Sequence, residues 1–175
     1  MPIDNTIKFV AINVVVITIS DTRKEEEDKS GKFLEKRIND LGHNLLNKII
    51  IKDDFLLIKK TILKFAKQKV VDVIITTGGT GLTGRDSTPE ALQSVADKII
   101  EGFGELFRQL SFNKIGTSTI QSRAIAGVVR GTYVFCLPGS PNACKDGWDE
   151  ILKYQLDIRH RPCNFIEIMD RLNEK

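Results

Sequence analysis

Cysteine, histidine and long hydrophobic runs are scarce in this chain of 175 residues. Its three cysteines are Cys136, Cys144 and Cys163, an odd number without a CxxC pair, which argues against a disulfide framework and a zinc ribbon. We therefore expect reduced thiols. The two histidines, His43 and His160, have no partners at metal-ligand spacing, and we interpret both as structural or surface residues. No Ser-His-Asp or Cys-His arrangement is readable either.

Signals for a membrane or for secretion are also missing. The longest apolar run, Phe9 to Thr18, contains Asn13 and is too short to span a bilayer. The first residues carry Asp4 and Lys8 and lack the basic start and cleavage site of a signal peptide. We therefore expect a cytoplasmic protein without a membrane partner. The net charge of +3 comes from scattered lysines rather than from a dense basic run, so we do not expect a nucleic-acid partner.

The hydrophobic share of 41% is enough to build one compact core, and we expect a single domain over residues 1–175 with its core at about 10–165. Three segments rich in Val and Ile, Val10–Ser20, Asn44–Ile51 and Val70–Thr77, are predicted as strands, and Thr132–Leu137 as a later one. Segments with helical spacing separate them. This alternation is typical of an α/β fold with a mostly parallel sheet.

The helices are predicted from capping residues and apolar spacing. We expect helices over Lys32–Leu41, around Glu105–Leu110, around Ser118–Ala126 and over Asn142–Leu156. Asp53 or Asp54 can cap a helix that contains Leu57, Ile58, Ile62 and Phe65. Ser87 and Glu90 fit a capping box, with Pro89 in the first turn of that helix.

A glycine-rich loop, Thr77–Gly81 (TGGTG), is the strongest local signal for function. Glycines let the backbone approach an anion closely, and the N–H groups at the start of the next helix can face it. A tight turn without a ligand is the alternative. The loop is not a Walker A loop, because no Gly-Lys-Ser/Thr follows. Residues 79–84 match GxGxxG, but the helix starts too late and Asp97 lies in a helical pattern, which disfavours a nicotinamide dehydrogenase.

Two aspartates can join this loop at the carboxyl edge of the sheet. Asp86 follows the loop closely, and Asp54 follows the second strand. A carboxylate beside a phosphate site calls for a cation between them, and Mg²⁺ is the usual one. Two carboxylates and Mg²⁺ suit phosphoryl or nucleotidyl transfer, although each aspartate alone can serve as a cap. The segments Ser20–Asp21 and Pro138–Ser140 end other strands, so we expect them at the same edge.

These motifs together resemble the MoaB/MogA family of molybdopterin-binding proteins, and more closely its MoaB branch. The resemblance runs from about Asn13 to Phe165. It is carried by TISD at 18–21, TGGTG at 77–81 with Asp86, GFGE at 102–105, TSTIQSR at 117–123 and LPGS at 137–140. It implies a three-layer α/β/α subunit that forms a homotrimer or homohexamer.

The resemblance also implies chemistry and residues for it. Active members of the family join AMP from ATP to the phosphate of molybdopterin with Mg²⁺, and a molybdenum-insertion protein is a possible partner. Asp54 and Asp86 take the catalytic and metal positions. The implied substrate-binding residues are Ser20, Asp21, Thr77, Gly78, Gly79, Thr80, Gly81, Glu105, Ser111, Ser122, Pro138, Gly139 and Ser140. A molybdopterin-binding carrier or assembly protein without turnover is the alternative.

Overall fold

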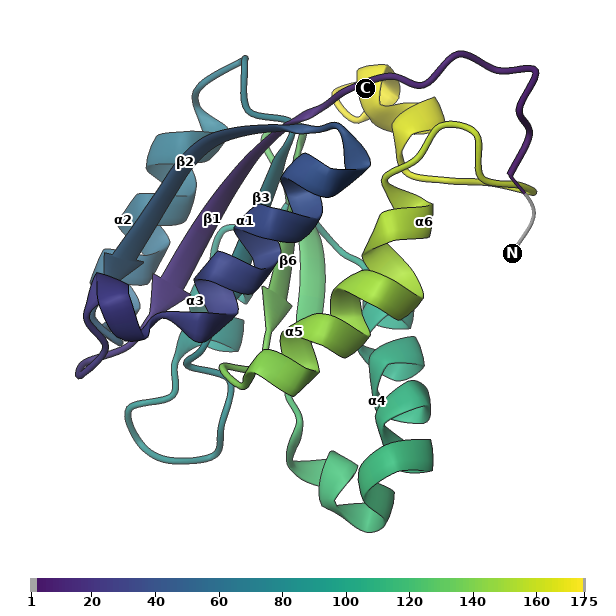
Figure 1. The fold of residues 1–175 in the computed structure, drawn as a ribbon. Helices are drawn as coiled ribbons and strands as arrows, with labels where there is room; N and C mark the ends of the chain where they lie inside the picture. Colours follow the sequence, from purple (N-terminus) through teal and green to yellow (C-terminus); the bar gives the residue numbers. More distant parts are fainter. Residues whose placement is uncertain (1–2, 175) are drawn as a thin grey trace.

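The computed structural model describes residues 3–174 as three layers, with a six-stranded sheet between two layers of helices (Figure 1). The strands are β1 (Asn13–Ile19), β2 (Asn44–Ile51), β3 (Val73–Thr77), β4 (Lys98–Ile99), β5 (Ile125–Val129) and β6 (Thr132–Leu137). Their order is β2-β1-β3-β6-β5-β4. In this order, β2, β1, β3 and β6 run parallel to one another, whereas β5 pairs antiparallel with both β6 and β4. The predicted α/β class with a mostly parallel sheet is confirmed.

Six α-helices are present among the described residues. They are α1 (Lys29–Leu41), α2 (Phe55–Ala66), α3 (Thr88–Gln93), α4 (Glu101–Ile115), α5 (Pro141–Gly147) and α6 (Lys153–Gln155), and a π-helical turn, η3 (Trp148–Leu152), joins the last two. Short 3-10 helices lie at η1 (Glu25–Glu27), η2 (Gly116–Gln121) and η4 (Ile166–Arg171). In the described part of the chain, no helix combines the length and apolar character that a membrane crossing needs.

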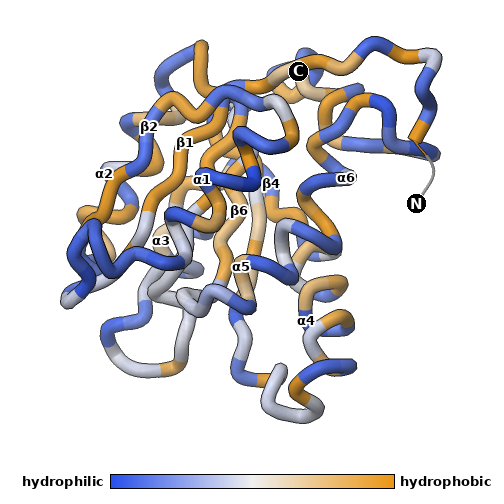
Figure 2. Tube along the Cα trace, viewed as in Figure 1, coloured by the Kyte–Doolittle hydropathy of each residue, from blue (hydrophilic) through white to orange (hydrophobic). Residues whose placement is uncertain are grey.

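The sheet is covered on both faces, which explains why its strands are nearly continuous runs of Val and Ile. On one face, Val14 and Val16 of β1 pack in a cluster with Leu34 of α1 and Phe103 of α4. On the other face, Ile17 packs in a cluster with residues of α2 and α3. Figure 2 shows the central strands as the hydrophobic part of the molecule. Neighbouring residues of one strand therefore point into different halves of the core.

Two local predictions are wrong, and packing explains both. The predicted helix around Ser118–Ala126 is instead the 3-10 helix η2 followed by β5. Residues 125–129 pair with β6 one by one, and this tertiary pairing outweighs their local pattern. The capping box at Ser87 is also absent, since the Ser87 side chain makes no cap hydrogen bond. Its hydroxyl donates instead to Oδ1 of Asp53, at 3.3 Å.

The helix α1 begins earlier than predicted because of a buried cap. Asp28 occupies the N-cap position, four residues before the predicted start at Lys32, and its Oδ1 accepts a hydrogen bond from the Gly31 amide at 2.9 Å. Its Oδ2 accepts the hydroxyl of Thr18 at 2.7 Å, which ties the helix start to β1. The helix ends at Leu41, as predicted, and Gly42 caps it in the left-handed region with φ 96°.

Candidate functional site

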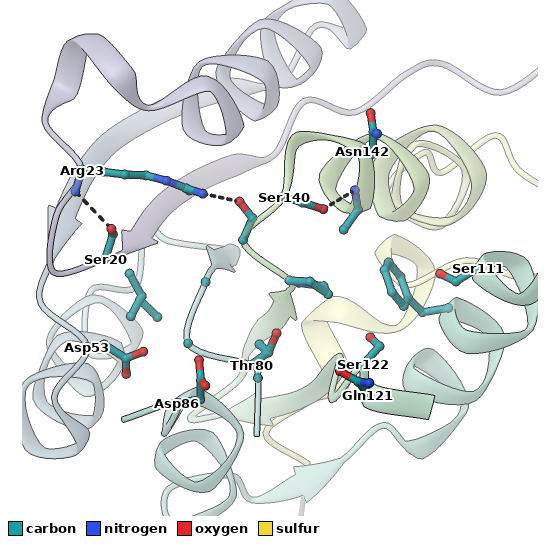
Figure 3. A pocket seen from close by; sticks show the side chains of 18 of the residues that line it. Ser20, Arg23, Asp53, Thr80, Asp86, Ser111, Gln121, Ser122, Ser140 and Asn142 are labelled. Carbon is teal, nitrogen blue, oxygen red and sulfur yellow. Dashed lines mark hydrogen bonds between the residues drawn. The ribbon is translucent and has the colours of Figure 1, made fainter. Parts of the chain in front are cut away.

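A cavity of about 620 Å³ opens at the carboxyl ends of β1, β3 and β6 (Figure 3). These strands end side by side, because Thr77 of β3 pairs with Thr18 of β1 and with Leu137 of β6. The segments that follow them, Ser20–Asp21, 78–81 and Pro138–Ser140, all line the cavity. The expected convergence on one sheet edge is confirmed.

The glycine loop forms the floor of this cavity in a conformation that other residues rarely adopt. Gly78 and Gly79 have φ angles of 107° and 64°. A Cβ at Gly78 would lie 2.1 Å from the carbonyl oxygen of Ile19, and one at Gly79 would lie 2.3 Å from the hydroxyl oxygen of Thr88. Thr88, the first residue of α3, also donates its hydroxyl to the Gly78 carbonyl at 2.9 Å. The loop is therefore held against the helix start by contacts that only glycine permits.

Asp53 provides one carboxylate of the cavity. It follows β2, and a Cβ at Gly79 would lie 2.9 Å from its Oδ2. Burial raises the pKa of Asp53; hydrogen bonds from Ser87 oppose the rise, and the nearby negative charges of Asp86 and Asp21 add to it. Concentrated negative charge of this kind favours a bound cation.

Asp86 provides the second carboxylate of the cavity, beside Gly81 of the glycine loop. Its Oδ2 accepts hydrogen bonds from the Thr83 hydroxyl at 2.6 Å and from the Thr83 amide at 2.9 Å. The hydrogen bond from the Thr83 side chain is the main cause that lowers the pKa of Asp86. Asp86 is therefore ionised at neutral pH beside Gly81, whose Cβ would lie 2.6 Å from the same Oδ2.

Asp21 closes the acidic corner at the rim of the cavity. Its Oδ1 accepts the Asp53 amide at 3.3 Å and pairs with the exposed Arg85 guanidinium at 2.9 Å. The neighbouring Ser20 uses its hydroxyl oxygen locally, where it accepts the backbone amide of Arg23 at 3.1 Å. Asp21 and Ser20 thus shape the turn after β1 and also line the cavity.

The turn Pro138–Ser140 forms the wall above the glycine loop, and several donors fix its carbonyl groups. The Gly139 carbonyl accepts Nη2 of Arg23 at 2.7 Å and the Ser30 hydroxyl at 2.9 Å. The Pro138 carbonyl accepts the Thr77 hydroxyl at 3.0 Å. A Cβ at Gly139 would lie 3.2 Å from the Cα of Gly78, so the two glycine turns are in close contact.

The far wall of the cavity is more apolar. Phe107 and Ser111 of α4 contribute buried side chains, and Ile115 and Gln121 extend the wall toward η2 (Figure 3). The Oγ of Ser122 is buried and has no hydrogen-bond partner among the described residues. A planar apolar ligand with polar edges suits such a surface, because it can pack on Phe107 and satisfy Ser122.

A sequence model of the family described as "Probable molybdopterin binding domain" matches residues 15–158. This match covers the sheet except for the first two residues of β1, and it includes every residue that lines the cavity. The chain belongs to this molybdopterin-binding family.

Individual relatives agree with the family match. Molybdenum cofactor biosynthesis protein B of Escherichia coli K12 is 45% identical over 90% of this chain and 93% of that protein. A crystal structure of a molybdenum cofactor biosynthesis protein B is 37% identical, with a TM-score of 0.85 over 95% of this chain and 98% of the other. The tungsten cofactor synthesizing protein MoaB from Pyrococcus furiosus is 33% identical, with a TM-score of 0.77 over 94% and 98% of the two chains.

The structure brings most of the predicted site residues of this family member to the cavity, but not all of them. Ser20, Asp21, Gly78, Gly79, Thr80, Gly81, Asp86, Ser111, Ser122, Pro138, Gly139 and Ser140 line it. Thr77 lies just behind the wall, where it supports Pro138. Glu105 faces a separate surface hollow with Glu101 and Arg108.

The predicted place of Asp54 is corrected by one residue. Asp54 caps α2, with its Oδ1 accepting the Leu57 amide at 2.8 Å, and its side chain is outside the cavity lining. Asp53 occupies the position that we assigned to Asp54. The physical reason is that the extended N-cap residue turns its carboxylate back onto its own helix, which leaves the preceding residue to face the glycine loop.

The cysteines and histidines of this member of the molybdopterin-binding family supply the cavity with neither a metal cluster nor a nucleophile. Among residues 3–174, no group of three or more His, Cys, Asp or Glu side chains forms a metal cluster. All three cysteines are free, as expected, and burial raises the pKa of Cys136 to about 12 and that of Cys144 to about 11. These two buried thiols are protonated at neutral pH and are not nucleophiles.

Proposed function

We propose that this protein binds molybdopterin in the cavity and attaches AMP to it from Mg-ATP, as a step of molybdenum cofactor biosynthesis. The observation that carries the proposal is the pair of carboxylates, Asp53 and Asp86, that lie against Gly79 and Gly81 of the glycine loop. Family membership and the relatives named above support the pterin as ligand. The apolar wall with Phe107 and Ser122 supports a ring system as its body.

The proposed transfer balances without a further reactant. A phosphate oxygen of the pterin attacks the α-phosphorus of ATP, and a new phosphorus–oxygen bond forms. The bond from the α-phosphorus to the oxygen that bridges it to the β-phosphorus breaks, and its electron pair leaves with pyrophosphate. The glycines let the phosphates of the ligand approach the backbone of the loop closely. The protein then acts by positioning the reactants and by stabilising their charge.

The residues present fit a magnesium ion. Mg²⁺ prefers oxygen ligands and is usually bound by one or two carboxylates together with substrate phosphates, which matches Asp53 and Asp86. The raised pKa of Asp53 points the same way, because part of its cause is repulsion from Asp86 and Asp21. The ion would neutralise phosphate charge in this acidic corner. Asp53 and Asp86 would hold it, while Thr83 fixes the orientation of Asp86.

The proposal is tested by mixing purified protein with molybdopterin and Mg-ATP and detecting the AMP–pterin adduct by mass spectrometry. We expect adduct and pyrophosphate in equal amounts. Pterin binding without adduct, under conditions in which an active relative turns over, would replace the enzyme with a molybdopterin-binding carrier or assembly protein. Absence of pterin binding would overturn both functions.

Assembly into a homotrimer or homohexamer in the cytoplasm is part of the same proposal, and a molybdenum-insertion protein is its proposed downstream partner. Large apolar side chains are exposed on α4 and η2, with Phe112, Ile115 and Ile120 at 56%, 55% and 82% exposure. Apolar surface of this kind supports association. Light scattering at micromolar concentration should give three or six times the subunit mass of 19.7 kDa, and a monomer mass would refute the assembly.

A further inference from the structure

The cavity has an uneven distribution of charge. Its acidic lining residues are Asp21, Asp53, Asp86 and Asp146. Among the described residues that line it, Arg23 is the single lysine or arginine. A ligand that carries phosphate groups therefore meets one fixed positive charge in this cavity.

The protein holds the Arg23 side chain in place with a hydrogen bond, but its described residues leave one nitrogen of the guanidinium without a partner. It lies in the loop after β1, and its side chain extends along the cavity wall toward the Pro138–Ser140 turn (Figure 3). Nη2 donates to the Gly139 carbonyl at 2.7 Å. Nη1 is buried and has no hydrogen-bond partner in the described part of the chain. None of the ion pairs within residues 3–174 includes Arg23.

An arginine in this state favours an anion. A guanidinium group has five N–H donors and no acceptor, and a partly buried one without a counter-ion carries a desolvation cost. A bound anion removes that cost. The planar fork of the guanidinium matches two oxygens of a phosphate group, which makes phosphate a better partner than a single carbonyl.

The surroundings of Arg23 suit the same anion. Gly139, which it contacts, lies against Gly78 of the glycine loop, where a Cβ would lie 3.2 Å away. A Cβ at Gly139 would also lie 3.7 Å from Nη2 of Arg23, so the glycine leaves the guanidinium free of a side chain at this point. The carboxylates Asp53 and Asp86 lie instead beside Gly79 and Gly81, where added Cβ atoms would lie 2.9 and 2.6 Å from their Oδ2 atoms. A phosphate beside Arg23 and Gly139 would thus face Gly78 rather than the part of the loop next to the carboxylates.

We propose that Arg23 is a phosphate-binding residue of this cavity, because its guanidinium has no counter-ion and its buried Nη1 has no hydrogen-bond partner among the described residues. The inference rests on the proposed function for the identity of the ligand. The phosphate belongs either to the pterin or to ATP, and both offer the same chemistry. Arg23 then contributes to selection of a phosphorylated ligand over its unphosphorylated form.

Two ligand pairs distinguish these sources. Dissociation constants are measured by calorimetry without Mg²⁺ for an oxidised, air-stable pterin phosphate and its phosphatase-treated form, and for ATP and adenosine. Wild type is compared with Arg23→Met, which keeps an unbranched apolar stem and removes the charged guanidinium group. We expect Arg23→Met to weaken binding of one phosphorylated ligand by about 10- to 100-fold, the usual range for a hydrogen bond to a charged group. Its unphosphorylated counterpart should bind unchanged.

Ser30→Ala is the matched control. Ser30 donates to the same Gly139 carbonyl at 2.9 Å but does not line the cavity, so this variant loosens the turn and keeps the charge. It should retain the preference for phosphate. Arg23→Lys, which keeps the charge without the fork, should retain part of it. If Ser30→Ala reproduces the loss, Arg23 acts only on the turn and the inference is overturned.

The remaining outcomes separate the inference from the proposed function. Equal weakening of phosphorylated and unphosphorylated ligands by Arg23→Met overturns the inference and leaves the function intact. If wild type binds neither pterin form but binds ATP through Arg23, the proposed function fails and the inference stands. If wild type binds none of the four ligands, both are overturned.

Discussion

The Nε of Arg123 lies 2.8 Å from the carbonyl oxygen of Gly81, at the start of the loop that carries Asp86. Nη2 of the same guanidinium donates to the carbonyl oxygen of Asp86 at 2.8 Å, at the end of that loop. Nη1 forms an ion pair with Glu90 of α3. One side chain thus joins both ends of the 81–86 loop to the helix that follows.

Replacement of Arg123 by Met should release this loop. We expect the amides of residues 82–86 to exchange hydrogen about tenfold faster or more, because opening of the loop no longer breaks three contacts. The free energy of unfolding should fall by about 1–2 kcal/mol, the scale of charged hydrogen bonds at a partly exposed site. Arg171→Met, which removes an exposed pair with Glu174, is the control. Unchanged hydrogen exchange of these amides in Arg123→Met would show that the loop stays closed without the Arg123 contacts.

Two alanine substitutions can be compared, one in the glycine loop and one just after it. Gly79→Ala places a methyl group 2.3 Å from the Thr88 hydroxyl oxygen at φ 64°, so we expect a loss of stability of about 3 kcal/mol or more. Gly84→Ala meets nothing within 4 Å and should leave stability within about 0.5 kcal/mol of wild type. Urea unfolding measures both. Equal effects would mean that the loop backbone is not constrained as described.

A buried histidine should make the stability depend on pH. Burial lowers the pKa of His43 to about 4, from its ordinary value of 6.5. Between these values the unfolded chain binds a proton that the folded chain excludes, so stability is complete above pH 6.5 and falls as the pH drops toward 4. The size of this loss is about 3 kcal/mol.

The test compares wild type with His43→Asn, whose amide oxygen can replace Nδ1 as acceptor for the Ile12 amide. The variant should be less stable at pH 7, because its side chain loses the stacking on Phe9. Its free energy of unfolding should nevertheless change less between pH 6.5 and 4 than that of wild type. Parallel pH profiles of the two proteins would assign the acid sensitivity to other groups.

The sheet and the site edge were predictable from the sequence because their signals are local. The Val/Ile runs of β1 and β3 specify strands that are covered on both faces, and a parallel sheet brings the ends of such strands together. The glycines at 78–81 likewise signal positive φ angles, which Gly78 and Gly79 adopt. These features needed no knowledge of distant contacts.

Features that depend on distant contacts were missed. The choice between Asp53 and Asp54 depends on the angle at which β2 enters α2, and two adjacent aspartates give no local signal for it. Arg23 and Arg123 act through carbonyl groups 116 and 42 residues away, and a lone arginine in a loop has no sequence pattern that indicates such a bond. The short strand β4 forms only by pairing with β5.

The pair Asp53 and Asp54 offers the most direct test of the account. Single-turnover transfer of AMP to molybdopterin with Mg-ATP is measured for wild type, Asp53→Asn and Asp54→Asn. Asparagine at position 54 can still cap the helix, so Asp54→Asn should transfer AMP at the rate of wild type. Transfer by Asp53→Asn should be slower by about a hundredfold or more, which corresponds to about 2.7 kcal/mol of barrier. A loss confined to Asp54→Asn, or full transfer by Asp53→Asn, would contradict the claim that Asp53 and Asp86 hold the reacting phosphates through a metal ion.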